Sequence, residues 1–559
     1  PQDLNRVIQR ADGVPLFGVE LALLLREQRP INGGHAQASE NEVPVSLADL
    51  LMARLDQLGP AKHVAQLAAV IGSQVPHDIL MSLSNLSEDV LRANIATLRT
   101  HDILRPTDGR GTTYSFRHAM LRDAAYGSLL KSRRRDLHRA VAVAMRDETG
   151  GSAPSKAGNL AYHWTNAGEV EASIHAWTQA GHYASDRHAF VEAEDAYAAA
   201  VAALLQQPAS PGRDRWELAL QSPYADALRI TRGLSARQTM QATQRARTLA
   251  DQSGDSEQQL LHAWGSWAAA SSGGDFEAGR ILANQFGQLA LVNGLPRHLA
   301  TANMMQMTSR FRIGDICGAE DAFRQGAPYF DDIAFLAQPG FAAQTFGNAA
   351  MIAWTLGDDG QAQQRIEGAL FAGPGDDNPF DTVYGQLMYA AYLNLTEHYD
   401  GAARYALDSI ALCDKYSIAQ FAASSRIMLG RAKVGLGAAE EGVAMMRQGI
   451  AEMQEKGVRV AMTRYLTWLA EGYVEAGCFD AALVSADEAL TINPREFFCR
   501  PESIRVRGLI LWKSGHVGRA EQDFLAAEQL ARHMGAARHT QRAAESLRSL
   551  RLEVGQKPH

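Results

Sequence analysis

The sequence predicts an all-α fold in which a small helical domain with one β-hairpin precedes a long solenoid of paired helices. Apolar residues recur at helical spacing through almost the whole chain of 559 residues, which is too long for one compact domain. Residues 102–116 combine two short alternating runs with a polar turn, as in a hairpin. From Gly233 onward, glycines that can end a helix recur about every 40 residues.

The small domain is expected over residues 44–150, after a polar linker at 31–43. Its first helix starts at Ser46-Leu47-Ala48-Asp49, which resembles a capping box. Helices that precede a two-stranded hairpin describe a winged-helix domain. Three further helices of this domain are expected at 60–72, 77–83 and 87–100, before the hairpin.

The segment 114–139 connects this domain to the rest of the chain. A short strand ends at Arg117, a helix opens near His118, and a second helix carries a basic run from Lys131 to Arg139. Asp136 interrupts the basic run, and the same helix has an apolar face. We therefore favour a solvated face or a domain-packing helix over a DNA contact.

Residues 151–559 are predicted to form the solenoid. Gly357 and Gly437 are 80 residues apart, which is twice the usual spacing of the turn glycines, and a matching turn near Tyr399 and Asp400 lies within this double gap. One helix pair in a solenoid cannot bury its apolar face alone, so the repeats must stack. The turn glycines are Gly233, Gly274, Gly314, Gly357, Gly437, Gly477 and Gly515.

Two of the repeats match the tetratricopeptide pattern, in which small residues let two helices approach and large ones fill the groove between them. A polar, Arg-rich last helix at 537–552 is typical of a terminal cap. The first pair combines Trp177, Gly181 and Ala184 with Ala193, Tyr197 and Ala200, and the second combines Leu466, Leu469, Ala470 and Tyr473 with Ala482, Ala486 and Ala489.

Composition argues against several partner classes. The net charge is −8, with +1 on residues 1–150 and −9 on the remainder, which disfavours non-specific nucleic-acid binding. The four cysteines are widely separated, as expected in a reducing cytoplasm. No apolar run is long enough to span a bilayer. The chain begins with Pro1, and we expect it to be a piece of a longer protein.

No motif for nucleophilic or metal-ion catalysis is present, and no glycine is followed by lysine, which excludes a P-loop within these residues. Two features could touch a nucleotide that is held by another domain. Gly13-Val14-Pro15 breaks a helix and starts another, and His118 lies where a helix N-terminus could face an anion. The simpler interpretations are a helix corner for the first and a cap or core histidine for the second.

These segments together resemble STAND-type signalling ATPases. Residues 11–17 (ADGVPLF) are similar to the corner of their helical subdomain, and residues 43–56 to the start of their winged helix. Residues 116–126 (FRHAMLRDAAY) are similar to its closing motif. The resemblance implies that residues 1–30 are a remnant of the ATPase module, and that Gly13, Pro15 and His118 lie near the nucleotide. A single Glu20 stands where the family usually has paired glutamates.

The resemblance implies a regulatory segment whose parent protein is an ATPase that binds ATP or ADP with Mg²⁺, often fused to a class III adenylate or guanylate cyclase. The chain itself is expected to hold no cofactor and no metal. Its partners would be its own upstream ATPase domain and a protein or small-molecule effector on the solenoid, with no membrane and no nucleic acid. The alternatives are a winged-helix transcriptional regulator and a tetratricopeptide scaffold for protein binding.

Overall fold

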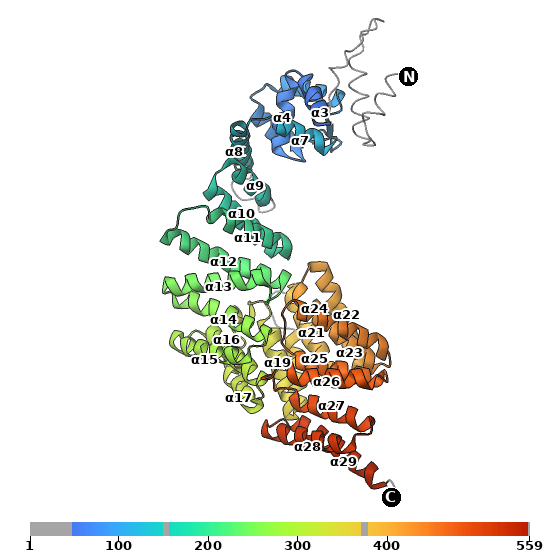
Figure 1. The fold of residues 1–559 in the computed structure, drawn as a ribbon. Helices are drawn as coiled ribbons and strands as arrows, with labels where there is room; N and C mark the ends of the chain where they lie inside the picture. The colour runs from blue at the N-terminus through green and yellow to red at the C-terminus, as the bar shows by residue number, and fades with distance from the viewer. Residues whose placement is uncertain (1–46, 149–155, 371–377, 557–559) are drawn as a thin grey trace, which may run out of the picture. The chain divides into compact units, whose positions relative to one another are not determined.

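The structure is a computed structural model that describes residues 47–148, 156–370 and 378–556 (Figure 1). The described chain is almost entirely helical and forms two compact units. The first unit extends to Ala180 and includes Ala202–Gln206, and the second contains Gly181–Val201 and everything from Gln207 onward. The all-α prediction is confirmed.

The first unit follows the predicted order of helices and hairpin. Helices α4, α5 and α6 lie within one or two residues of the predicted bounds, because their apolar spacing and flanking breakers are local properties. Its helices are α3 (Leu47–Asp56), α4 (Ala61–Ile71), α5 (His77–Ser84), α6 (Glu88–Thr100), α7 (Ala119–Gly127), α8 (Lys131–Glu148), α9 (Ala157–Ala167) and the first part of α10 (Val170–Asp186).

The sheet of this unit has three strands, and not the two that the sequence predicts. Strands β2 (Leu104–Pro106) and β3 (Thr113–Phe116) form the predicted antiparallel hairpin. A two-residue strand, β1 (Val75–Pro76), pairs antiparallel with the other edge of β3, giving the order β1-β3-β2. A strand this short has no alternating pattern of its own, so only its pairing with β3 reveals it.

The second unit is a succession of helix pairs, as predicted for the solenoid. From α12 to α17 and from α19 to α29, each helix packs against the next one along the chain. Its helices are the last part of α10, α11 (Phe190–Leu204), α12 (Pro211–Arg232), α13 (Arg237–Ser253), α14 (Ser256–Gly273), α15 (Phe276–Asn293), α16 (Pro296–Arg312), α17 (Ile316–Gly326), α18 (Ile333–Leu336), α19 (Phe341–Leu356), α20 (Asp359–Leu370), α21 (Pro379–Leu395), α22 (Tyr399–Tyr416), α23 (Ala419–Gly435), α24 (Ala439–Glu455), α25 (Met462–Glu475), α26 (Phe479–Thr491), α27 (Arg500–Lys513), α28 (Val517–His533) and α29 (Ala537–Gln556).

Each glycine of the predicted series ends the first helix of a pair in a left-handed or otherwise positive-φ conformation. The φ angles run from +73° at Gly477 to +91° at Gly233. In the double gap, Glu397 takes the same role with a φ of +63°, just before α22. A glycine adopts such angles without the steric cost of a side chain, which explains its use at these turns.

The predicted small-residue contacts bring paired helices together. A Cβ added to Gly181 would lie 2.5 Å from the ring of Tyr197, so the tyrosine packs directly on the glycine backbone. In the later repeat, Ala470, Ala482 and Ala486 form a buried cluster with side chains of α27. The tetratricopeptide-like packing inferred from these residues is therefore confirmed.

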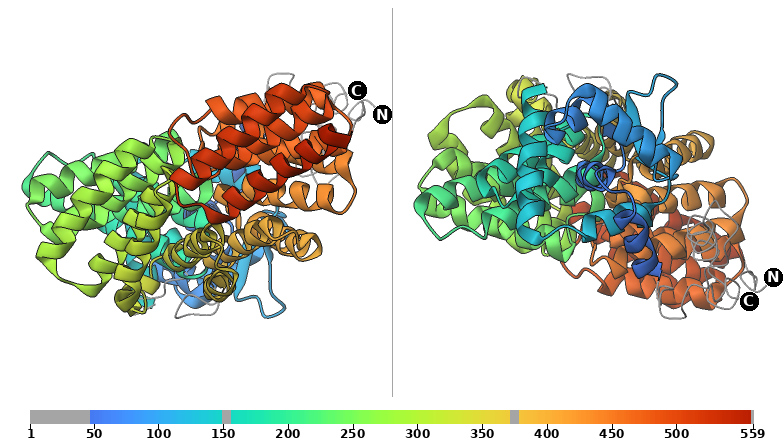
Figure 2. Two further views of the ribbon diagram at one scale, coloured as in Figure 1. Left: turned by 90° about the horizontal axis from the view of Figure 1, so that it is seen from below. Right: turned by 90° about the horizontal axis from the view of Figure 1, so that it is seen from above.

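The second half of the solenoid folds back onto its first half. The backbone N–H groups of Arg459 and Val460 donate to the carbonyl oxygen of Ser272, at 2.7 and 3.1 Å. Those of Phe497 and Phe498 donate to the carbonyl oxygen of Arg312, at 2.8 and 3.3 Å. Figure 2 shows the C-terminal helices (red) alongside the earlier helices (green).

These contacts form a regular series, which we call the closure contacts. The turn after α12 approaches Gly457, and the turn after α14 approaches Arg459 and Asn493. The turn after α16 approaches Phe497 and Met534, and the turn after α19 approaches Ala537. Successive turns of the first half thus meet successive turns of the second half in chain order.

Candidate ligand-binding cavity

Two neighbouring cavities lie inside the second unit, next to the closure contacts. The first has a volume of about 180 Å³ and is lined by α12, α14, α16, α19, α21 and α23 and by residues 456–465 before and within α25. The second has a volume of about 240 Å³ and shares Arg229, Leu234, Trp264 and Pro339 with the first. We call them the closure cavity and the side cavity.

One wall of the closure cavity is aromatic. The rings of Tyr384 and Phe421 stack with centroids 4.5 Å apart, and Phe380 lies 5.1 Å from Phe421. The guanidinium of Arg229 lies over the Phe380 ring at 4.7 Å and over Trp264 at 5.6 Å. Such rings offer a flat apolar surface to a planar ligand.

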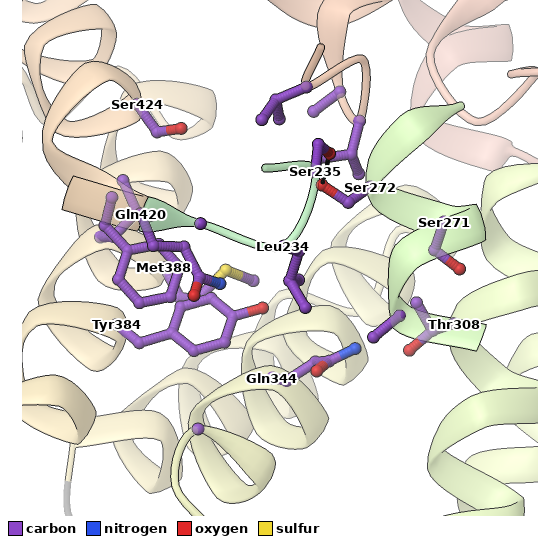
Figure 3. Close-up of a pocket in the computed structure, with 18 of the residues that line it drawn as sticks. Leu234, Ser235, Ser271, Ser272, Thr308, Gln344, Tyr384, Met388, Gln420 and Ser424 are labelled. Atoms are coloured by element: carbon purple, nitrogen blue, oxygen red, sulfur yellow. Dashed lines mark hydrogen bonds between the residues drawn. The ribbon is translucent and has the colours of Figure 1, made fainter. Parts of the chain in front are cut away.

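The opposite side of the cavity is polar. Figure 3 shows Gln344, Thr308 and Ser271 facing Tyr384 and Gln420 across the space. Thr308 accepts a long hydrogen bond of 3.4 Å from Asn348, whereas the buried Oε1 of Gln420 has no partner among the described residues. Burial raises the pKa of the Tyr384 phenol to about 12, so its hydroxyl keeps its proton and can donate.

Buried charge concentrates where the cavity meets the closure contacts. Glu496 is fully buried and accepts from the backbone N–H groups of Ala461 (2.8 Å) and Thr463 (3.2 Å) and from Asn493 Nδ2 (2.9 Å). Arg312 lies 3.8 Å from the same carboxylate. Glu496 thereby ties the segment before α25 to the turn at 493–496.

The side cavity has a mixed charge. Asp226 faces it and lies 3.6 Å from Arg229, and burial raises the pKa of the Asp226 carboxyl. Its side chain is 59% exposed and is part of the cavity lining. Burial likewise raises the pKa of Asp381, near Gly340, to about 6, although the Gly340 N–H donates to this carboxylate.

Of the site residues predicted from the sequence, His118 is the one that the structure describes. Gly13 and Pro15 fall outside the described residues. His118 belongs to the first unit, directly before α7, with extended φ and ψ angles and no side-chain bond to the helix N-terminus. Its position at a helix start is therefore as predicted, and it belongs to the first unit, whereas the cavity residues belong to the second.

The residues that line the two cavities were not predicted from the sequence. Arg464 offered the clearest clue, because it is a lone cation within an apolar helix segment, MTRYLTWLA. Tyr384, Gln344 and Gln420 have no spacing that distinguishes them from ordinary helix residues. Among the described residues no group of side chains could hold a metal ion, and no helix has the length and apolarity that a membrane span requires.

No protein-family model matches the chain. An uncharacterized protein of Rhizobium meliloti is 26% identical over 325 residues, which make up 57% of this chain and 31% of that protein. The chain therefore matches less than a third of that relative's length.

Comparison with solved structures gives partial matches. A Rap protein complexed with competence and sporulation factor is 12% identical, with a TM-score of 0.40 over 61% of this chain and 99% of that one. Human IFIT1 with m7Gppp-AAAA is 15% identical, with a TM-score of 0.38 over 68% and 82%. A STAND protein with a tetratricopeptide repeat sensor from Pyrococcus horikoshii is 12% identical, with a TM-score of 0.27 over 98% and 68%.

Proposed function

We propose that this chain is the sensory and coupling segment of a STAND-type signalling protein. The solenoid binds an effector in the closure cavity. The first unit, as a winged-helix domain, passes this binding on to the nucleotide state of an ATPase domain in the parent protein. The observation that carries the proposal is a cavity with one aromatic and one polar side at the place where the two halves of the solenoid close on each other.

The closure contacts are suited to respond to a ligand. They consist of a few backbone hydrogen bonds and turn contacts, and a typical hydrogen bond contributes only about 0.5–1.5 kcal/mol net. Ser272, Arg312 and Val460 belong both to these contacts and to the cavity lining. A ligand that touches these residues would favour the closed arrangement by its differential affinity for it.

The coupling step would require ATP or ADP with Mg²⁺ in the parent protein. In this proposal Gly13 and Pro15 would lie near that nucleotide, and His118 would donate a hydrogen bond to a phosphate oxygen. The position of His118 just before α7 supports the last role, because the unpaired N–H groups of a helix start attract anions.

The transcription-regulator alternative has less support. On α6, Arg92 pairs with Glu88 at 2.5 Å, and Arg99 is the one other basic residue of the helix that would enter a groove. On α8, Arg134 donates to the carbonyl of Leu129 and Arg139 pairs with Glu169. These arginines are occupied within the first unit, as expected for a packing helix.

The test compares two turn glycines in the complete parent protein. A Cβ at Gly314 (φ +88°) would lie 2.7 Å from the Cβ of Phe497, across the closure contacts. A Cβ at Gly515 (φ +84°) would meet nothing within 4 Å. Both Gly→Ala changes cause similar backbone strain, but only the first obstructs closure.

The measured quantity is the rate of ADP release. We expect Gly314→Ala to change it and Gly515→Ala to leave it at the wild-type value. Equal rates for the two variants would show that solenoid closure is not coupled to the nucleotide, and the proposal would be abandoned.

A further inference from the structure

We propose that the closure cavity binds a small organic anion with a planar apolar body, and that the guanidinium of Arg464 is its charge partner. This deepens the proposed function by naming the class of effector, and it rests on that function only for the claim that the binding is sensed.

The charged side chains that line the closure cavity are all basic. Arg232 pairs with Glu194 at 2.5 Å, Arg229 lies 3.6 Å from Asp226, and Arg312 lies 3.8 Å from Glu496. Lys456 is exposed and reaches only a backbone carbonyl, at 3.4 Å. The lining contains no aspartate or glutamate.

Arg464 is half-buried, and no carboxylate of the described residues lies within ion-pair distance of it, although Glu496 attracts it from farther away. Its polar contact is a weak one, from Nη1 to the sulfur of Met351 at 3.8 Å, and its Nε is buried without a partner among the described residues. Its guanidinium lies over the ring of Phe498 at 4.5 Å. Burial lowers the pKa of Arg464, but an arginine keeps its proton even so.

The carboxylates around Arg464 are already occupied. Glu496 accepts three N–H donors and faces Arg312. On the other side of Arg464, Glu471 pairs with Arg431 at 3.2 Å, and Glu502 pairs with Arg505 at 2.5 Å. Among the described residues one positive charge therefore has no ion-pair partner of its own, and a largely desolvated charge without such a partner is unfavourable. An anionic ligand in the cavity would supply that partner.

The walls specify the rest of the ligand. The stacked pair Tyr384–Phe421 and the neighbouring Phe380 provide a flat apolar surface. The Tyr384 hydroxyl can donate a hydrogen bond, and the free Oε1 of Gln420 can accept one. The volume of about 180 Å³ is close to that of cavities known to hold one aromatic ring. A carboxylate or phosphate on a one- or two-ring body fits these features.

The experiment uses three matched probes that differ in one group: 2-naphthoate, 2-naphthamide and 2-naphthyl phosphate. Isothermal titration of the purified chain should show 2-naphthoate binding with 1:1 stoichiometry, about ten-fold tighter than the neutral amide. If 2-naphthyl phosphate binds more tightly still, the natural anion is a phosphate, and if it binds more weakly, the natural anion is a carboxylate.

Arg464→Met should weaken 2-naphthoate about ten-fold and leave 2-naphthamide unchanged, whereas Arg464→Lys should retain part of the preference. Arg519→Met is the control, because Arg519 is exposed on α28 away from the lining. Equal binding of naphthoate and naphthamide, no binding of naphthoate up to its solubility limit, or an Arg464→Met variant with undiminished preference would overturn the proposal.

Thermal unfolding without ligand gives a second, independent readout. Because Arg464 has no acidic partner, Arg464→Met should keep or raise the melting temperature. A large fall would show that the arginine is structurally paired and would overturn the proposal even without a binding measurement. This outcome differs from a failure of the sensor function, which would leave anion selectivity intact while Gly314→Ala leaves ADP release unchanged.

Discussion

Gly314 and Phe497 touch across the two halves of the solenoid, so closely that a Cβ on the glycine would lie 2.7 Å from that of the phenylalanine. The Phe497 N–H donates to the carbonyl of Arg312, two residues before Gly314. Closure therefore depends on a residue without a side chain at this point. The same glycine belongs to the periodic series that marks the repeats.

The first prediction concerns stability at this contact. Gly314→Ala and Gly515→Ala should each lose about 1 kcal/mol through left-handed strain. Gly314→Ala should lose a further 1–3 kcal/mol, roughly, because Phe497 must move. Urea unfolding of the two variants measures the difference. Identical midpoints would contradict the close approach of the two halves.

The second prediction concerns pH and the first unit. His138 and His163 are buried with their Nδ1 atoms 2.9 Å apart, and the Tyr126 hydroxyl lies 2.9 Å from His138 Nε2. One of the two Nδ1 atoms must lack a proton for this bond to form. Burial is the main cause that lowers the pKa of each imidazole to about 4.

The sign of the pH effect follows from these values. The unfolded chain takes up protons near its ordinary histidine pKa of 6.5, whereas the folded pair does not until about pH 4. The free energy of unfolding keeps its full value above pH 6.5. It decreases as the pH falls toward 4, by at most about 1.4 kcal/mol per pH unit for each histidine. Denaturant unfolding across this range should show a shallower slope in His163→Gln than in the wild type. Equal slopes would exclude the pair as the source.

The third prediction concerns Glu496. Its carboxylate is fully buried, holds the N–H groups of Ala461 and Thr463, and faces Arg312. Glu496→Gln leaves that arginine without its acidic partner and should cost about 3–5 kcal/mol. The exposed Glu455→Gln is the control and should lie within about 0.5 kcal/mol of wild type. A Glu496→Gln variant as stable as the control would show that the buried cluster contributes little.

The fourth prediction concerns His118. The ring is half-buried and makes no side-chain hydrogen bond in its helix start. His118→Ala should therefore change the melting temperature of this chain little. In the complete protein it should speed ADP release by about ten- to a hundred-fold, since a charge-assisted hydrogen bond is worth roughly 1.5–3 kcal/mol. Unchanged release together with a large fall in melting temperature would identify His118 as a core residue instead.

Local patterns determined most of the architecture. The turn glycines, the small-residue faces around Gly181 and Ala482, and the helices of the first unit all follow from residues close together in the chain. Helix spacing, caps and left-handed turns act over a few residues, so the sequence displays them directly. The third strand at Val75 escaped prediction because its partner Tyr114 is distant in sequence.

Only the tertiary structure decided how the solenoid closes and where its cavity lies. The path of a solenoid results from small rotations added over many repeats, and no single repeat encodes the sum. That sum brings Ser272 to Arg459 and Arg312 to Phe497. Whether Arg464 has an acidic partner likewise depends on side chains from several distant helices. The sequence by itself thus determined the repeats and their turns, and the accumulated rotation between repeats decided which charges remain unpaired around the cavity.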